Sequence, residues 1–244
     1  MVDHKILNKF IEFAGQLGAQ RHLVAIRNGF VAIMPLIIAG SLAVLLNNFP
    51  VLGDFDLIQF LDHIFGEGIW QIVGNSIWNA TFAILGILLS FSISYHLAKS
   101  YELDGLSVGL LTVASYIMLV PTTNDGGLSF AWIGAQGIFV AIFLSILITE
   151  FFRIFMKSKL FIIKLPEGVP EGVAKSFAAL LPALIILLVV GLFQTLLSTL
   201  LETSIFELIY YLIQEPLHGL GNSLAAAMLI SFLHHFLWFF GLHG

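Results

Sequence analysis

The chain has 244 residues, of which 59% are hydrophobic and only 10% are charged. Soluble domains average about 25% charged residues, so this composition excludes an ordinary soluble protein and indicates an integral membrane protein in contact with the lipid bilayer. A net charge of −5 argues against a nucleic-acid partner, and the lack of cysteine excludes disulfides, thiolate metal ligands and a cysteine nucleophile within the chain.

Residues 4–20 predict an amphipathic helix ahead of the first long apolar segment. Ile6 and Phe10 fall on one helical face, whereas Lys5 and Lys9 fall on another. This separation is typical of a helix that lies in the plane of the membrane interface. A structural lead-in helix is the simpler interpretation, and a membrane anchor or gate is the alternative.

Six segments are apolar and long enough to be considered as membrane spans. A helix rises about 1.5 Å per residue and the hydrocarbon core is about 30 Å thick, so a span needs about 20 residues. The third segment is short and contains glycine and serine, so of the six segments it is the one whose full crossing is least secure. The predicted spans are residues 30–49, 76–98, 105–121, 130–152, 176–200 and 221–242.

A shorter helix is predicted over residues 204–214. Ser204 and Glu207 have the spacing of a capping box, and Pro216 provides a stop. Eleven residues are too few to cross a membrane, so this helix is expected on the outer surface or against other helices. The predicted fold class is therefore all-α, a polytopic transmembrane helix bundle of about six spans with interfacial amphipathic helices.

The distribution of basic residues predicts the orientation of the bundle. The links after the first, third and fifth spans contain no lysine or arginine. Because basic residues favour the cytoplasmic side, both termini are predicted to be cytoplasmic. The other segments hold all the basic residues, namely Lys5, Lys9, Arg21, Arg27, Lys99, Arg153, Lys157, Lys159, Lys164 and Lys175.

The predicted spans carry neutral polar groups but no carboxylate at mid-membrane. Glu150 lies near the end of the fourth span, where Arg153 is a suitable ion-pair partner. The absence of other carboxylates argues against an ion-coupled permease and leaves a neutral, hydroxyl-rich substrate open. Pro35 and Pro182 are expected to kink their spans. Most of the serine, asparagine and glutamine side chains are expected to bond within or between helices.

The histidines give no metal or catalytic site. His234 and His235 are adjacent and so point about 100° apart on a helix, which makes them poor ligands for one ion. His243 lies in the C-terminal sequence WFFGLHG, where the flanking glycines leave its imidazole accessible. We therefore predict no cofactor, no metal and no catalytic residue.

Three separated motifs resemble one known family. They are residues 21–41, which contain RHLVAIRNGF and MPLIIAGS, residues 166–182, which end in SFAALLP, and residues 238–244, WFFGLHG. In this order they resemble the membrane IIC subunits of the bacterial phosphoenolpyruvate-dependent sugar phosphotransferase system (PTS), of the lactose, cellobiose and diacetylchitobiose type. Glu171 departs from the family, whose members commonly have a second proline there.

The resemblance covers the N-terminal part of such a subunit only. Family members continue past the WFFGLHG-like motif to an Asn-Glu-Pro motif whose glutamate helps to hold the sugar. Here the nearest sequence, Gln214-Glu215-Pro216, has glutamine first and precedes His243. Residues 1–244 are therefore expected to be the N-terminal part of an EIIC membrane domain, as a fragment, a split gene or a truncation.

The resemblance implies a homodimer in a bacterial plasma membrane that binds and translocates a β-linked disaccharide. A separate IIB protein, phosphorylated on cysteine, would then phosphorylate the sugar. It also implies that His243 contacts the sugar, close to the reacting hydroxyl. No chemistry is expected in this chain alone. The alternative is a non-transporting membrane scaffold or degenerate remnant that only dimerises.

Overall fold

The structure, a computed structural model, is described here for residues 15–16, 18–49, 56–123, 126–158, 160–161, 163, 166, 168–216, 228 and 231–232. Over these ranges the regular secondary structure is helical, with one isolated bridge between Thr122 and Leu128. The longer helices are α2 (Arg21–Asn47), α4 (Ile69–Ala80), α5 (Leu85–Ser100), α6 (Gly105–Leu119), α8 (Ile138–Lys157) and α9 (Glu171–Leu200), and the shorter ones are α3 (Leu57–Phe65), α7 (Phe130–Ile133) and α10 (Ile205–Ile209).

Four helical segments are long and apolar enough to cross a membrane. They are Arg21–Asn47, Ile69–Ser100, Ala135–Lys157 and Gly172–Leu200. The predicted third span is the 15-residue helix α6, which is about 22 Å long and falls short of the hydrocarbon thickness. The predicted span 221–242 lies outside the described residues except at 228, 231 and 232, so the total of six stays a prediction.

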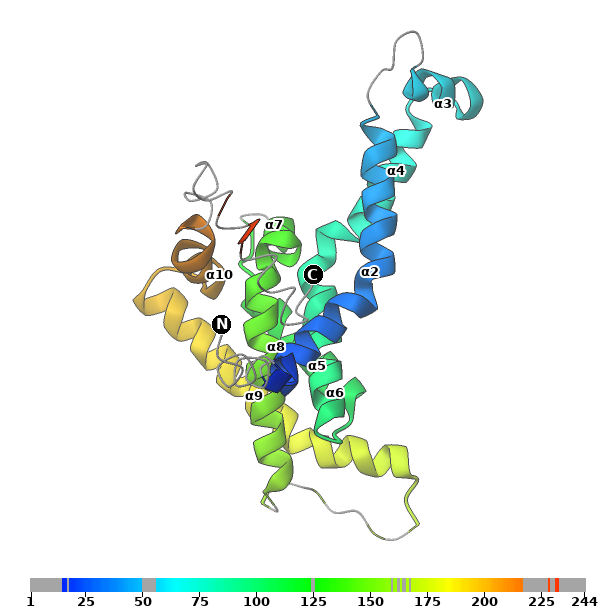
Figure 1. Ribbon diagram of the computed structural model, residues 1–244. Coiled ribbons are helices and arrows are strands. Elements are labelled where there is room, and N and C mark those ends of the chain that lie inside the picture. Colours follow the sequence, from blue (N-terminus) through cyan, green and yellow to red (C-terminus); the bar gives the residue numbers. More distant parts are fainter. Residues whose placement is uncertain are drawn as a thin grey trace, which may run out of the picture.

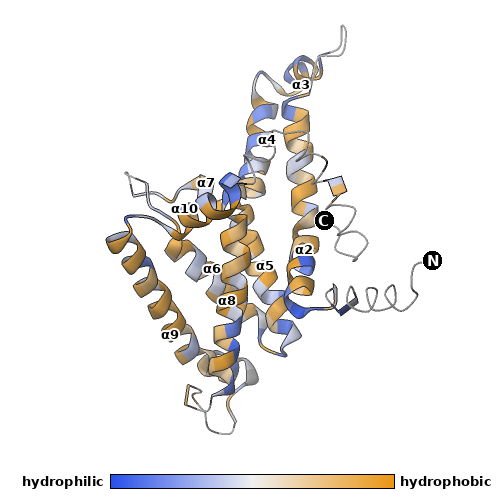
Figure 2. Ribbon diagram, turned by 60° about the vertical axis from the view of Figure 1, so that its left-hand side comes forward, coloured by the Kyte–Doolittle hydropathy of each residue, from blue (hydrophilic) through white to orange (hydrophobic). Residues whose placement is uncertain are grey.

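The first span starts earlier than the sequence predicts. Helix α2 begins at Arg21 instead of residue 30, because the Gln20 side chain caps it by accepting a hydrogen bond of 2.9 Å from the Leu23 amide. Of the predicted lead-in helix, only Gly15, Gln16 and residues 18–20 are described. Figure 2 shows apolar residues along the spans and hydrophilic ones at the start of α2.

Helix α5 lies at the centre of the bundle, in contact with α2, α6 and α8, while α2 and α4 form an arm with α3 at its tip (Figure 1). Leu89 and Ile93 of α5 are fully buried. A Cβ atom on Gly29 would lie only 2.5 Å from Ile93 Cγ1 and 3.1 Å from Ile93 Cα. Ser92 Oγ also donates a hydrogen bond of 3.1 Å to the Gly29 carbonyl. Glycine thus allows α2 and α5 to meet at their backbones.

Two helical segments are interrupted beside each other. Between α4 and α5 the chain forms a 3-10 turn, η1 (Phe82–Ile84), and between α7 and α8 it forms η2 (Ala135–Gly137). A Cβ on Gly134 would lie 3.1 Å from the Phe82 carbonyl oxygen, so the two interruptions touch. The predicted span 130–152 is thus a short helix, a break and a long helix.

Side chains satisfy the carbonyl groups that the second break releases. Tyr116 Oη donates to the Trp132 carbonyl at 2.6 Å. Gln214 Nε2 donates to the Gln136 carbonyl at 2.7 Å. Such partners are needed because a free carbonyl inside a membrane costs several kcal/mol.

An aromatic cluster joins the short helices to the core. The ring centroids of Trp132 and Tyr210 lie 6.0 Å apart. The centroid of the Phe206 ring lies 5.3 Å from that of Tyr116 and 5.6 Å from that of Trp132. Helix α10 begins with the predicted capping box: Glu207 accepts a bond from the Ser204 amide at 2.9 Å, and Ser204 Oγ accepts one from the Glu207 amide at 3.2 Å. The predicted short helix is confirmed, and it continues as a π-helical turn, η3 (Tyr210–Gln214).

The two prolines predicted to kink spans both lie inside helices, Pro35 in α2 and Pro182 in α9. Both helices change direction along their length in Figure 1. A proline removes one helical hydrogen bond and its ring crowds the preceding turn, which accounts for such bends.

Candidate functional site

The predicted sugar contact, His243, lies outside the described residues, as do His234 and His235. Its contact with a sugar stays a prediction. Among the described residues, no group of three or more histidine, aspartate or glutamate side chains is arranged to hold a metal ion.

Most of the described hydroxyl groups inside the spans bond to backbone carbonyls, as predicted, whereas the buried Ser115 hydroxyl has no hydrogen-bond partner. Ser94 Oγ donates to the Ser90 carbonyl at 2.6 Å, and Thr112 Oγ1 donates to the Val108 carbonyl at 2.9 Å. Ser145 Oγ reaches from α8 to the Ser90 carbonyl of α5 at 3.1 Å. The first two bonds lie within one helix, the third joins α8 to α5, and each hydroxyl hydrogen is already used.

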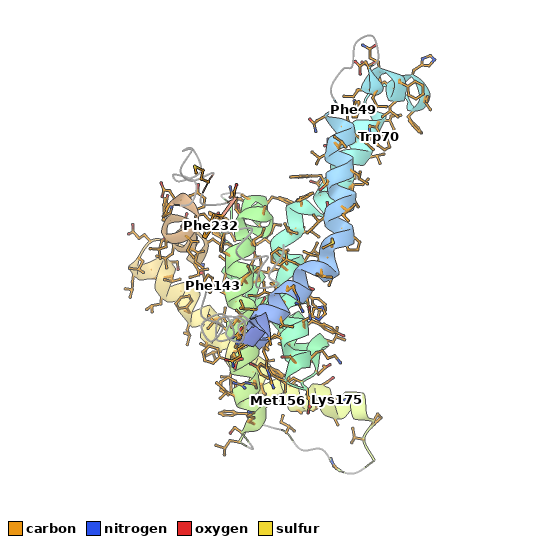
Figure 3. All side chains as sticks on the ribbon, viewed as in Figure 1. Phe49, Trp70, Phe143, Met156, Lys175 and Phe232 are labelled. Atoms are coloured by element: carbon orange, nitrogen blue, oxygen red, sulfur yellow. The ribbon has the colours of Figure 1, made fainter. Side chains whose placement is uncertain are left out.

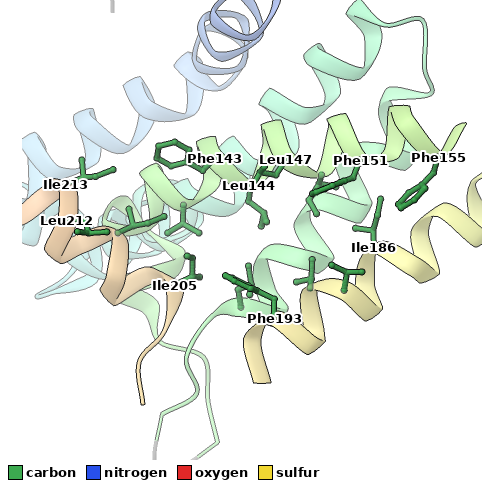
Figure 4. A pocket seen from close by; sticks show the side chains of 16 residues that line it. Phe143, Leu144, Leu147, Phe151, Phe155, Ile186, Phe193, Ile205, Leu212 and Ile213 are labelled. Atoms are coloured by element: carbon green, nitrogen blue, oxygen red, sulfur yellow. The ribbon is translucent and has the colours of Figure 1, made fainter. Parts of the chain in front are cut away.

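Helices α8, α9 and α10 enclose an apolar groove of about 550 Å³ (Figure 4). A disaccharide placed here would leave its hydroxyl groups without partners, which costs free energy for each group. The groove therefore excludes a sugar and suits hydrocarbon. Its lining is Leu119, Val140, Phe143, Leu144, Leu147, Ile148, Phe151, Phe155, Ile186, Val189, Val190, Phe193, Ile205, Ile209, Leu212 and Ile213.

Amide side chains fasten α2 to α4 near the far end of the arm. Asn47 Nδ2 donates to the Gln71 carbonyl at 3.3 Å and to Asn75 Oδ1 at 3.4 Å. A Cβ on Gly74 would clash with the Asn47 amide, so glycine makes room for this contact. A hollow of about 260 Å³ lies at this contact and is bordered by Asn47, Gly74 and Trp78. The arrangement is typical of an interhelical clamp.

A charged cluster lies at the opposite end of the bundle. The predicted pair of Glu150 and Arg153 is confirmed, with 2.6 Å between Oε2 and Nη2. Glu150 Oε1 also accepts hydrogen bonds from Tyr101 Oη at 2.6 Å and from His22 Nε2 at 3.0 Å. Because the Gln20 amide nitrogen faces His22 Nδ1 at 2.6 Å, the imidazole hydrogen lies on Nε2.

Tyr101 is the centre of this cluster. The guanidinium carbons of Arg153 and Arg21 lie 4.4 Å and 5.2 Å from the centroid of its ring. Burial and the hydrogen bond to Glu150 raise the pKa of Tyr101, so its hydroxyl remains a donor. Sequence reasoning found one pair of this cluster and missed the rest, because 128 residues separate His22 from Glu150.

Comparison with known proteins places the chain in a family. Residues 27–244 match the family described as "Phosphotransferase system, EIIC". The chain belongs to this family. The match confirms the resemblance drawn from the three sequence motifs, and it includes the segment that contains His243.

Relatives and a solved structure resemble this EIIC chain over nearly all of its length. The cellobiose-specific EIIC component of Geobacillus stearothermophilus is 34% identical over 252 residues, which are 97% of this chain and 54% of that protein. The lichenan permease IIC component of Bacillus subtilis (strain 168) is 31% identical over 256 residues, 100% of this chain and 56% of that protein.

The crystal structure of the transporter ChbC, the IIC component from the N,N'-diacetylchitobiose-specific phosphotransferase system, superimposes with a TM-score of 0.83. The identity is 34%, and the match covers 96% of this EIIC chain and 56% of ChbC. The two share their fold over this region. This EIIC chain spans about half the length of the relatives it matches.

Proposed function

We propose that this EIIC chain is a membrane permease component of a phosphoenolpyruvate-dependent sugar PTS and that it binds and translocates a β-linked disaccharide of the cellobiose type. The observation that carries the proposal is the likeness to ChbC, with a TM-score of 0.83 at 34% identity. The names of two further relatives, for cellobiose and lichenan, support the same substrate class.

The proposed partner is a separate IIB protein that carries phosphate on a cysteine. The phosphoryl group would move from that sulfur to the sugar hydroxyl, and the hydroxyl proton would move to the imidazole of His243. These 244 residues contain no cysteine, so the phosphorylated cysteine of this proposal lies outside them. Phosphorylation would trap the sugar, because a doubly charged ester does not cross apolar lipid.

The proposed orientation has both termini in the cytoplasm. Arg21 donates a hydrogen bond of 3.3 Å to the Ser100 carbonyl, and the Arg153 guanidinium lies over Tyr101. Basic residues from α2 and α8 thus meet at the end of α5, which supports the prediction that they lie on one side of the membrane. We further propose a homodimer of about six spans per protomer.

Thermal unfolding of the purified chain with sugars tests the proposal. Cellobiose, lactose or diacetylchitobiose is expected to raise the unfolding temperature, whereas the α-linked disaccharide maltose is the matched negative control. His243→Ala should abolish the response, and His63→Ala, on the exposed face of α3, should retain it. No response to any β-linked sugar would favour the non-transporting scaffold.

A further inference from the structure

A hollow of about 420 Å³ lies beside the charged cluster, between the start of α2 and the ends of α5 and α8. Met156, one of its apolar lining residues, marks this end of α8 in Figure 3. The hollow thus lies at the C-terminal ends of Ile69–Ser100 and Ala135–Lys157, two helical segments long and apolar enough to cross a membrane. Its lining is Arg21, Ser100, Tyr101, Glu102, Leu103, Arg153, Met156 and Lys157.

The charges that line the hollow do not balance. Arg21, Arg153 and Lys157 face one lining carboxylate, Glu102. Glu150 forms the ion pair with Arg153, which leaves two basic side chains, Arg21 and Lys157, against the single carboxylate of Glu102. An uncompensated positive field in a partly enclosed site favours an anion.

Hydrogen-bond donors in the hollow are also incompletely used. Arg153 Nε is buried and has no hydrogen-bond partner. Within the described part of the chain, Arg21 and Lys157 form no ion pair. Arg21 is the first residue of α2, where the helix dipole adds partial positive charge. Guanidinium groups in this setting match the oxygens of a phosphate group.

We propose that this hollow binds the phosphate of an anionic membrane lipid. Two observations favour a lipid over a soluble phosphate. Leu103 and Met156 supply apolar side chains to the same hollow, and Leu106 of α6 and Ile154 of α8, close to them in sequence, are exposed apolar side chains. Basic pockets between membrane helices on the cytoplasmic side are known to take anionic headgroups. The site is independent of the proposed sugar.

Lipid binding to the delipidated, purified chain, measured by native mass spectrometry, tests the assignment. Phosphatidylglycerol and phosphatidylcholine with the same acyl chains would be compared at one ionic strength. Phosphatidylglycerol is expected to bind at least tenfold more tightly. Each of Arg21→Gln and Lys157→Gln should weaken this binding about fivefold, as expected for one basic residue.

Lys99→Gln is the matched control. It removes the same charge at the same end of α5, but Lys99 lies over the Tyr95 ring at 5.9 Å and does not line the hollow. Lys157 is exposed, so its substitution leaves the fold intact. Three results would each overturn the proposal. They are equal binding of the two lipids, a loss of phosphatidylglycerol binding in Lys99→Gln equal to that in the hollow variants, and binding of inorganic phosphate as tight as that of phosphatidylglycerol.

Discussion

The contact between α2 and α5 gives a sharp prediction. In Gly29→Ala, the new methyl group would lie 2.5 Å from Ile93 Cγ1 and 3.1 Å from both Ile93 Cα and Ile93 N. The side chain of Ile93 can turn, but its backbone cannot, so the helices must separate. Separation also lengthens the 3.1 Å bond from Ser92 to the Gly29 carbonyl.

The expected cost follows from these two effects. Overpacking costs about 1–3 kcal/mol, and an interhelical bond in a membrane protein contributes about 0.6 kcal/mol. Alanine is a better helix former than glycine, which offsets this cost by up to about 1 kcal/mol. With the full helix-propensity gain subtracted, Gly29→Ala should therefore destabilise the chain by about 0.6–2.6 kcal/mol.

Gly191→Ala is the matched control, because a Cβ at this position in α9 meets only Met118 Sδ at 3.5 Å. It should be neutral or stabilising by up to about 1 kcal/mol. Unfolding in detergent by added sodium dodecyl sulfate, followed by circular dichroism, measures both variants. If Gly29→Ala were as stable as Gly191→Ala, the close backbone contact would be refuted.

Three further predictions use the same unfolding assay. Glu150→Ala removes the acceptor for Tyr101, His22 and Arg153 and should lower the free energy of unfolding by about 2–3 kcal/mol. Glu150→Gln keeps an acceptor oxygen and should lower it by about half as much. Equal losses in the two variants would contradict the role of the hydrogen bonds. Tyr116→Phe leaves the Trp132 carbonyl without its 2.6 Å bond and should cost about 1–3 kcal/mol, while Tyr211→Phe, with an exposed ring, should be neutral. Asp104 accepts hydrogen bonds from Ser107 that hold the pKa of its carboxyl below the usual 3.8, so its contribution is complete above that pH and is lost as the pH falls through the lower folded value. Asp104→Asn should therefore flatten the stability profile as the pH falls below 3.8, and an unchanged profile would assign the acid sensitivity elsewhere.

Local patterns predicted the features that depend on neighbours in sequence. The capping box at Ser204 and the pair of Glu150 and Arg153 depend on spacings of three residues, and both are confirmed. The start of α6 after Asp104 also agrees with the predicted third span. In each case the stabilising partner lies within one helical turn, so the sequence contains the whole signal.

Features that depend on distant partners were missed. No proline marks the interruptions at η1 and η2, and the carbonyls released at η2 are paired by Tyr116 and Gln214, which lie in other helices. The hydrogen bond between His22 and Glu150 likewise joins the first span to the fourth predicted one. No spacing rule links such positions, because the fold alone brings them together.

The aromatic cluster around Phe206 has a consequence for how this part of the chain tolerates change. A long helix such as α2 contacts α4 and α5, so most single changes away from close contacts such as Gly29 disturb only a small part of its packing. Helix α10 has five residues before η3 and relies on a few rings, those of Tyr116, Trp132, Phe206 and Tyr210. Mutational sensitivity should therefore be high at each of these four rings, whereas in the long helices it should be confined to close contacts such as Gly29 and Glu150.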